Sequence, residues 1–163
     1  MSQKHFGEIA QIIRHTRKET LRTVEVAILY TYFNVGRTIK EEQKDKHTLP
    51  GDLLYKLSNE LTKEHGKSYS VENLKAFKQF YLLYSGRFFD SDLQKISTAW
   101  SESLAEIPHY DSVITLFKKK FSLTWLHDQF LIKIENDKVR NQLEKEAVQN
   151  GWSIEKLKLK FPE

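Results

Sequence analysis

The stretch most informative about the fold is residues 52–84, which read DLLYKLSNELTKEHGKSYSVENLKAFKQFYLLY. Leucines recur at helical spacing before Gly66, which predicts a helix over 52–64 with Asp52 as its N-cap. Gly66 suits the left-handed residue that follows a helix end, and Ser70 is placed to cap the next helix. The buried stripe expected for that next helix is Val71, Leu74, Phe77, Phe80 or Tyr81, and Tyr84.

The opposite face of this second helix is polar and basic. Between Gly66 and Phe88 there are four basic residues and one acid, Glu72. A helix, a glycine-containing turn and a second helix with a basic face is the arrangement that reads the DNA major groove. The sequence therefore predicts a helix-turn-helix-like pair over 52–84 that binds double-stranded DNA. The expected phosphate contacts are Lys67, Ser70, Lys75 and Lys78, and the expected base contacts are Asn73 and Gln79.

Two features leave alternatives open. The turn over 65–70 is longer than the usual three or four residues, so a plain helical hairpin with a solvated outer face fits the pattern as well. A second basic spot, Lys118, Lys119 and Lys120, is either a further phosphate contact or a solvated helix end. The aromatic residues Phe88 and Phe89 could stack on single-stranded bases.

The first element is predicted to be a long helix over 6–44, or two helices in line. One face is predicted to carry Leu21, Val24, Ile28, Val35 and Ile39, and an earlier apolar set is Phe6, Ile9, Ile12 and Ile13. Gly36 lies inside this helix at a cost of about 1 kcal/mol relative to Ala. We expect it there because another helix approaches closely.

The rest of the chain is predicted to be helical as well. The middle, 87–122, is the least regular part, with possible helices over 96–107 around Trp100 and Leu104, broken by Pro108, and over 112–121. The C-terminal helices span 125–160 in three pieces, namely 125–134, 137–149 ended by Asn150-Gly151, and a last one capped by Ser153. That last piece is predicted to be amphipathic and carries Ile154, Leu157 and Phe161.

Composition agrees with one all-α domain over 1–163, a helical bundle. Six glycines and three prolines allow few turns, while ten Phe, seven Tyr and three Trp can build a core. The net charge of +4 is a weak indication of an anionic partner. The chain has no cysteine, which excludes disulfides and thiolate metal sites. No secretory signal or membrane-spanning stretch is recognised, so we expect a cytoplasmic protein without a membrane partner.

Signals for catalysis are almost absent from the sequence. No two of the six histidines have a metal-binding spacing, and no nucleophile elbow or phosphate loop occurs. The one acid-x-Lys triplet, Glu42-Gln43-Lys44, lies at a predicted helix end without a strand around it, so a chance match is the better interpretation. We expect no catalytic residue, no cofactor and no metal in this chain.

Short motifs in a fixed order resemble a known family. They are Tyr32-Phe33-Asn34-Val35-Gly36-Arg37-Thr38-Ile39, Leu57-Ser58-Asn59-Glu60-Leu61, Gly66-Lys67-Ser68-Tyr69-Ser70, Asn73-Leu74, Phe80-Tyr81, Leu123-Thr124-Trp125, His127, Arg140, Glu146-Ala147, Trp152-Ser153 and Leu157. Together, over about 25–160, they resemble the N-terminal domain of the YhcG-type family of PD-(D/E)xK nucleases. The resemblance implies DNA binding or targeting, with cleavage by a nuclease domain C-terminal to this chain or on another subunit. No catalytic residue can be carried over.

A protein-interaction module is the alternative function. The long first helix would then form a self-association or docking surface, with a homodimer as one outcome. In that case the basic residues over 14–22 form a rim around an apolar stripe and do not contact DNA.

Overall fold

The computed structural model describes residues 3–46, 51–102 and 107–161, and these residues form α-helices and short 3-10 turns without any strand. The α-helices are α1 (Gln3–Lys46), α2 (Gly51–His65), α3 (Val71–Tyr84), α4 (Asp90–Glu102), α5 (Ile107–Lys120), α6 (Trp125–Leu131), α7 (Asp137–Asn150) and α8 (Ile154–Lys160). The 3-10 turns are η1 (Lys67–Tyr69) and η2 (Ser85–Arg87). The expectation of an all-α helical bundle is confirmed.

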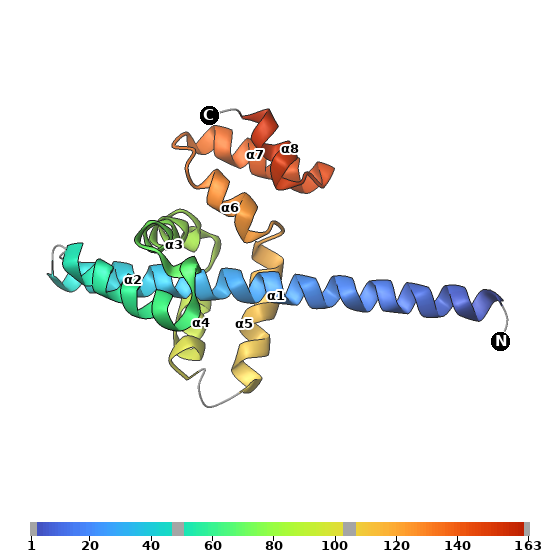
Figure 1. Cartoon of the computed structure of the whole chain (residues 1–163), viewed down its shortest axis with the longest axis horizontal. Helices are drawn as coiled ribbons and strands as arrows, with labels where there is room; N and C mark the ends of the chain where they lie inside the picture. Colours follow the sequence, from blue (N-terminus) through green and yellow to red (C-terminus); the bar gives the residue numbers. More distant parts are fainter. Residues whose placement is uncertain (1–2, 47–50, 103–106, 162–163) are drawn as a thin grey trace.

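The first element is one unbroken helix and not two in line. α1 has 44 residues and is therefore roughly 66 Å long at 1.5 Å per residue. Its C-terminal half runs through the bundle, and its N-terminal half projects beyond every other element as an arm (Figure 1). α2 folds back along the C-terminal half, while α3, α4 and α5 cross it, and α6, α7 and α8 lie together to one side (Figure 1).

The predicted apolar face of α1 is covered by the bundle along only part of its length. Ile39 is buried and Ile28 and Val35 are half-buried, but Leu21 and Val24 keep 67% and 52% of their surface exposed. The bundle instead covers a second apolar face that carries Val26, Leu29, Tyr30 and Phe33. Periodicity alone cannot choose between two apolar faces of one helix, because the choice depends on where the other helices pack.

The crossing of α1 and α3 explains Gly36. A Cβ built on this residue would collide with the backbone carbonyl oxygen of Phe77 in α3. The two helices make the most extensive helix–helix contact in the described chain. The expectation that another helix approaches closely at Gly36 is confirmed.

Three groups of buried side chains hold the bundle together. The largest lies between α1, α3, α4 and α5 and is rich in aromatic rings that meet edge to face, such as Phe33 with Phe80 and with Phe117. A second group joins α1, α2 and α3 around Leu74 and Phe77. The third lies within α6, α7 and α8 around Leu131 and Leu157. The buried stripe predicted for α3 is confirmed at Leu74, Phe77, Phe80 and Tyr84.

Helix ends follow the sequence signals in most places. The Ser70 hydroxyl accepts a hydrogen bond of 3.2 Å from the backbone N–H of Asn73 and caps α3, as predicted. Gly66 has a φ of 91° and Gly151 a φ of 59°, so both glycines hold backbone conformations that other residues rarely adopt. Ser153 caps α8 as expected. Asp52 is a correction, because α2 begins at Gly51 and Asp52 lies in its first turn.

The middle of the chain is more regular than predicted. α4 begins at Asp90 and α5 at Ile107, earlier than the expected starts, and Leu104 lies outside the described residues. Pro108 does not break a helix but lies in the first turn of α5, where its missing N–H has no intrahelical partner to lose. The predicted helix over 125–134 ends at Leu131. No helix in the described part of the chain is long and apolar enough to cross a membrane.

Candidate nucleic-acid interface

The outward face of α3 forms a polar ridge between two grooves. Glu72, Lys75, Gln79 and Leu82 are exposed there because the opposite face of the helix is buried against α1. Lys75 and Gln79 line both grooves, so these two side chains stand on the crest. Lys78, one of the expected phosphate contacts, is half-buried on the side nearer to α1 and α2.

The first groove lies between α3 and α6 and has a volume of about 340 Å³. Lys75 and Gln79 face Gln129 of α6 and Lys133, which follows the end of α6. The groove thus combines two ammonium groups with three side-chain amides, those of Asn73, Gln79 and Gln129, and with the carboxylate of Glu72. Ammonium and amide groups contact phosphates and base edges in protein–DNA complexes.

The second groove, of about 440 Å³, lies on the other side of the ridge between α3, α1 and α2. Its polar groups come from Gln43, Lys75, Lys78 and Gln79. The remaining lining is apolar and includes Ile39, Leu54 and Leu82. Its polar groups are therefore concentrated along the crest of α3, where the lysines lie one helical turn apart.

Two of the expected DNA contacts are used inside the chain. The Asn73 side chain donates to the backbone oxygen of Ser68 at 3.1 Å and accepts from the Gln129 amide at 3.2 Å. It therefore connects the η1 turn to α6. The Ser70 hydroxyl is occupied as the cap of α3, while Lys67 is exposed in η1. Both polar side chains thus position the turn and the ridge.

Gln129 and Lys133 are the residues of this site that sequence reasoning missed. Their four-residue spacing places them on one side of α6 and its continuation, which a helical wheel would have shown. No local signal says that this side faces α3, however, because the contact joins residues 56 positions apart.

The lysine run at the end of α5 does not join the ridge as one cluster. Lys118 donates to the Thr23 hydroxyl at 2.9 Å, and the Lys120 ammonium lies 5.7 Å from the centre of the Phe89 ring. Phe89 itself is exposed, whereas Phe88 is buried in the core. Lys119 is exposed beside a different groove.

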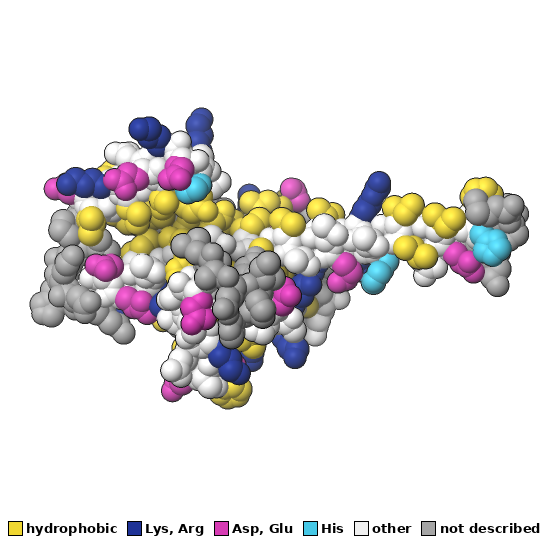
Figure 2. All heavy atoms as spheres, turned by 90° about the horizontal axis from the view of Figure 1, so that it is seen from below, with side chains coloured by type: hydrophobic (Ala, Val, Ile, Leu, Met, Phe, Trp, Pro, Cys, Tyr) yellow, Lys and Arg dark blue, Asp and Glu magenta, His cyan; other side chains and the backbone are white. Residues whose placement is uncertain are grey.

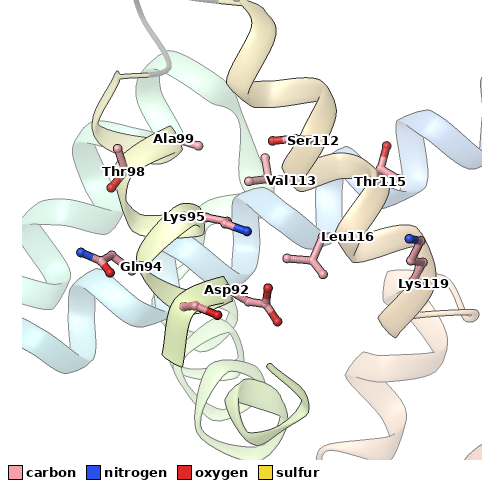
Figure 3. A pocket seen from close by; sticks show the side chains of 11 residues that line it. Asp92, Gln94, Lys95, Thr98, Ala99, Ser112, Val113, Thr115, Leu116 and Lys119 are labelled. Atoms are coloured by element: carbon pink, nitrogen blue, oxygen red, sulfur yellow. The ribbon is translucent and has the colours of Figure 1, made fainter. Parts of the chain in front are cut away.

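That groove lies between α4 and α5 and has a volume of about 750 Å³ (Figure 3). Asp92 and Lys95 project into it from α4, and Lys119 lies at its α5 edge. The floor is apolar, with Ala99, Val113 and Leu116. Of the predicted DNA contacts, this groove includes Lys119 alone, whereas the grooves beside α3 bring several of them together.

A polar network ties the third helix to the C-terminal helices. Arg87 binds both carboxylate oxygens of Glu144 at 2.6 and 2.5 Å and donates to the backbone oxygen of Lys120 at 3.2 Å. Arg22 of α1 donates to the neighbouring backbone oxygen, that of Phe121. Two guanidinium groups therefore neutralise the carbonyl end of α5, which favours positive charge.

Asp128 is buried beside this network. Its side chain is 1% exposed, and neither carboxylate oxygen has a hydrogen-bond partner among the described residues. Burial, reinforced by the charge of Glu144, raises the pKa of Asp128 to about 8, although Arg87 and Arg22 act in the opposite direction. Burial likewise raises the pKa of Tyr84 far above its ordinary value.

Residues of the family-like motifs have structural partners in this chain. Arg37 is buried and binds the carboxylate of Glu41 at 2.9 and 3.0 Å and the amide oxygen of Asn34 at 3.3 Å. His127 contacts the Thr124 hydroxyl and the Trp152 backbone oxygen, each at 2.8 Å. Since that backbone oxygen only accepts, the His127 Nε2 donates, and the ring joins α6 to the turn before α8.

Acidic and histidine side chains do not gather into a metal-binding cluster in the described residues. Within 3–46, 51–102 and 107–161, no three His, Asp or Glu side chains lie close enough together to hold a metal ion. Glu42 and Gln43 of the acid-x-Lys triplet lie near the end of α1, on a helix and not on a strand. The arrangement that the geometry does offer is a basic, amide-bearing surface.

Comparison with known proteins identifies the family. Residues 8–162 match the model of the DUF1016 N-terminal domain. The chain is 28% identical over 162 residues to the Escherichia coli (strain K12) protein named "Putative nuclease YhcG", and the match covers 95% of this chain and 43% of that protein. The chain thus spans less than half the length of this curated relative. No solved structure matches the chain. The chain belongs to the DUF1016 N-terminal domain family.

Proposed function

We propose that this chain is a non-catalytic domain that binds duplex DNA through the ridge of α3 and works together with a nuclease domain or subunit. The observation that supports it best is the ridge itself, where Lys75 and Gln79 stand between two grooves and face Gln129 and Lys133. Lysines give affinity through phosphates, and amide side chains distinguish bases in the major groove.

The proposal assigns different tasks to the residues. Lys67, Lys75, Lys78 and Lys133 contact phosphates, and Gln79 reaches base edges, while Gln129 holds the Asn73 side chain in place. Asn73 and Ser70 hold the ridge in position through the hydrogen bonds they make within the chain. Lys118 and Lys120 are left out, because their ammonium groups already have partners in the chain.

The nuclease association rests on the relative. The E. coli protein is named a nuclease, and this chain corresponds to 43% of its length. We propose that cleavage belongs to another part of such a protein, and that the present domain brings the nuclease to its DNA.

A charge-reversal experiment tests the interface. Lys75→Glu combined with Lys78→Glu is expected to weaken binding to a short labelled duplex at least tenfold, because phosphate contacts are lost and repulsion is added. The matched control is Lys145→Glu combined with Lys158→Glu, which makes the same charge change at exposed positions of α7 and α8. If both double variants bind duplex as the unaltered chain does, the α3 ridge is not the interface.

A protein-interaction module is the second candidate function. It is favoured by the α1 arm, on which Phe6, Leu21 and Val24 each expose more than half of their surface. Exposed apolar residues in a row on one helix are typical of a docking surface.

A further inference from the structure

The N-terminal arm of α1 has almost no support from its own chain. Between His5 and Leu21 every residue is exposed except Ala10, which is half-buried. Tertiary contacts begin at Arg22, which donates to the Phe121 backbone, and at the buried Val26. An isolated helix of this length is marginal in water, and Gly7 weakens it further. Within the chain, the arm is stabilised mainly by its continuity with the packed half of α1.

The arm carries an apolar stripe on the side opposite to the bundle. Because each residue advances by about 100° around a helix, Phe6, Ile9, Ile13, Leu21 and Val24 fall within an arc of about 120°. The residues that face the core, such as Val26 and Phe33, lie on the other side of the same helix. Figure 2 shows hydrophobic side chains recurring along the arm as far as the bundle.

At the other end of α1, the same side of the helix shares a hydrophobic cluster with α2. Tyr32, Val35 and Ile39 continue the stripe, and they belong to the cluster that also includes Leu54, Leu57 and Leu61 of α2. α2 runs antiparallel to α1, since Leu54 shares a groove with Ile39 while Tyr69, after α2, contacts Tyr32. This face therefore accepts an antiparallel helix, and the uncovered part ends where η1 and α2 begin to cover it.

The order of residues along the stripe is nearly palindromic. If a second arm lies antiparallel with its two-fold axis at residue 15, Phe6 faces Val24 and Ile13 faces the stem of Arg17. Along one edge of the stripe, Leu21 of one copy faces Ala10 of the other, and along the opposite edge Ile9 faces Thr20. At each of these contacts a large side chain meets a smaller one. In this register Gln3 of the second arm lies opposite Ala27, about one turn before Tyr32.

We infer that the arm pairs with the arm of a second copy of this chain, antiparallel and centred at residue 15, so that Phe6 of each copy packs on Val24 of the other. A parallel pair is disfavoured because it would bring the two Arg17 side chains, and the neighbouring basic residues, directly together. The inference supplies the partner for the protein-interaction candidate and does not depend on DNA binding.

Two adjacent isoleucines give a matched test. Ile13 lies on the stripe and is 47% exposed, whereas Ile12 lies about 100° away and is 65% exposed. Ile13→Lys is expected to raise the dimer dissociation constant at least tenfold in sedimentation equilibrium, because it removes an apolar contact and places a second cation beside Arg17 of the other copy. Ile12→Lys is expected to leave the dissociation constant within about twofold. Arg17→Leu is expected to tighten the dimer. A chain that is monomeric at every concentration, or equal effects of the two lysine substitutions, would overturn the inference.

Orientation is tested by disulfide formation, which is simple because the chain has no cysteine. Phe6→Cys alone should not crosslink, since position 6 of one copy lies about 27 Å from position 6 of the other in an antiparallel pair. A mixture of Phe6→Cys and Val24→Cys chains should form a disulfide-linked heterodimer. Crosslinking of Phe6→Cys with itself would contradict the antiparallel register.

The failure of this inference can be separated from failure of the DNA-binding proposal. Lys75→Glu combined with Lys78→Glu should dimerise as the unaltered chain does, because neither residue lies on α1. Ile13→Lys should still bind a duplex too short for two domains. Loss of both properties in either variant, with the fold intact by circular dichroism, would contradict two independent surfaces.

Discussion

At the scale of single residues, Asp128 makes the stability of the bundle depend on pH. Its carboxyl has an ordinary pKa near 3.8 in the unfolded chain, and burial raises the pKa in the folded state to about 8. Between these values the folded protein binds a proton that the unfolded chain has released. The stabilising contribution is therefore complete below pH 4 and is lost as the pH rises towards 8.

Asp128→Asn removes this dependence. We expect the variant to have a flatter profile of unfolding free energy between pH 4 and 9, and to be more stable than the unaltered chain at pH 9 by at least about 1 kcal/mol, since one unit of pKa shift corresponds to 1.36 kcal/mol. Urea denaturation at a series of pH values across this range measures the unfolding free energy of both proteins. Asp111→Asn, at an exposed position of α5, is the control and should leave the slope unchanged. The same slope in all three proteins would show that Asp128 is not the group responsible.

Gly36 offers a second test at residue scale. Gly36→Ala improves helix propensity by about 1 kcal/mol but places a Cβ against the Phe77 carbonyl, so we expect a net loss of at least about 2 kcal/mol. Gly7→Ala is the control, because a Cβ there has open space and should stabilise the helix. Thermal denaturation measures the Tm of the two variants. A rise in Tm for Gly36→Ala would mean that α1 and α3 leave room for a Cβ at their crossing.

At the scale of elements, α1 fixes the direction of α3, and α6 with the residue Lys133 after it completes the polar groove beside α3. Lys133, which follows α6, shares a groove with Lys75, while Lys120 at the end of α5 lies over Phe89. We expect Lys133→Ala to weaken binding to a short duplex about as much as Lys75→Ala, by roughly threefold to tenfold at low salt. Lys120→Ala should have little effect, and fluorescence anisotropy compares the three. An effect at Lys120 as large as that at Lys133 would move the interface towards α5.

How far the sequence predicts these elements depends on the range of the interactions. Local signals are sufficient for the cap at Ser70, the positive φ of Gly66 and the buried stripe of α3. They do not show that Leu21 and Val24 stay exposed, because α1 has two apolar faces and only the packing of distant helices selects which one is covered. For the same reason no local pattern places Gln129 and Lys133 beside α3. Nor does a local pattern show that the Asn73 side chain is hydrogen-bonded to Ser68 and Gln129.

At the scale of the whole molecule, α1 connects two surfaces of opposite character. Its C-terminal half supports α3 and the basic ridge, and its N-terminal half presents the apolar stripe away from the bundle (Figures 1 and 2). In the proposed antiparallel dimer the two arms would link two ridges through one two-fold axis. A dimer of this kind would suit a DNA site with two similar halves.

Duplex binding across a salt series is the decisive test of the α3 ridge as a DNA interface. We expect the purified chain to bind a short duplex with micromolar or tighter affinity at low salt, with log K falling linearly as log salt rises. The slope should correspond to about three or four phosphates, which matches the four lysines assigned to the ridge and its grooves. Absence of binding even at low salt, or an affinity that does not respond to salt, would contradict DNA binding through these lysines.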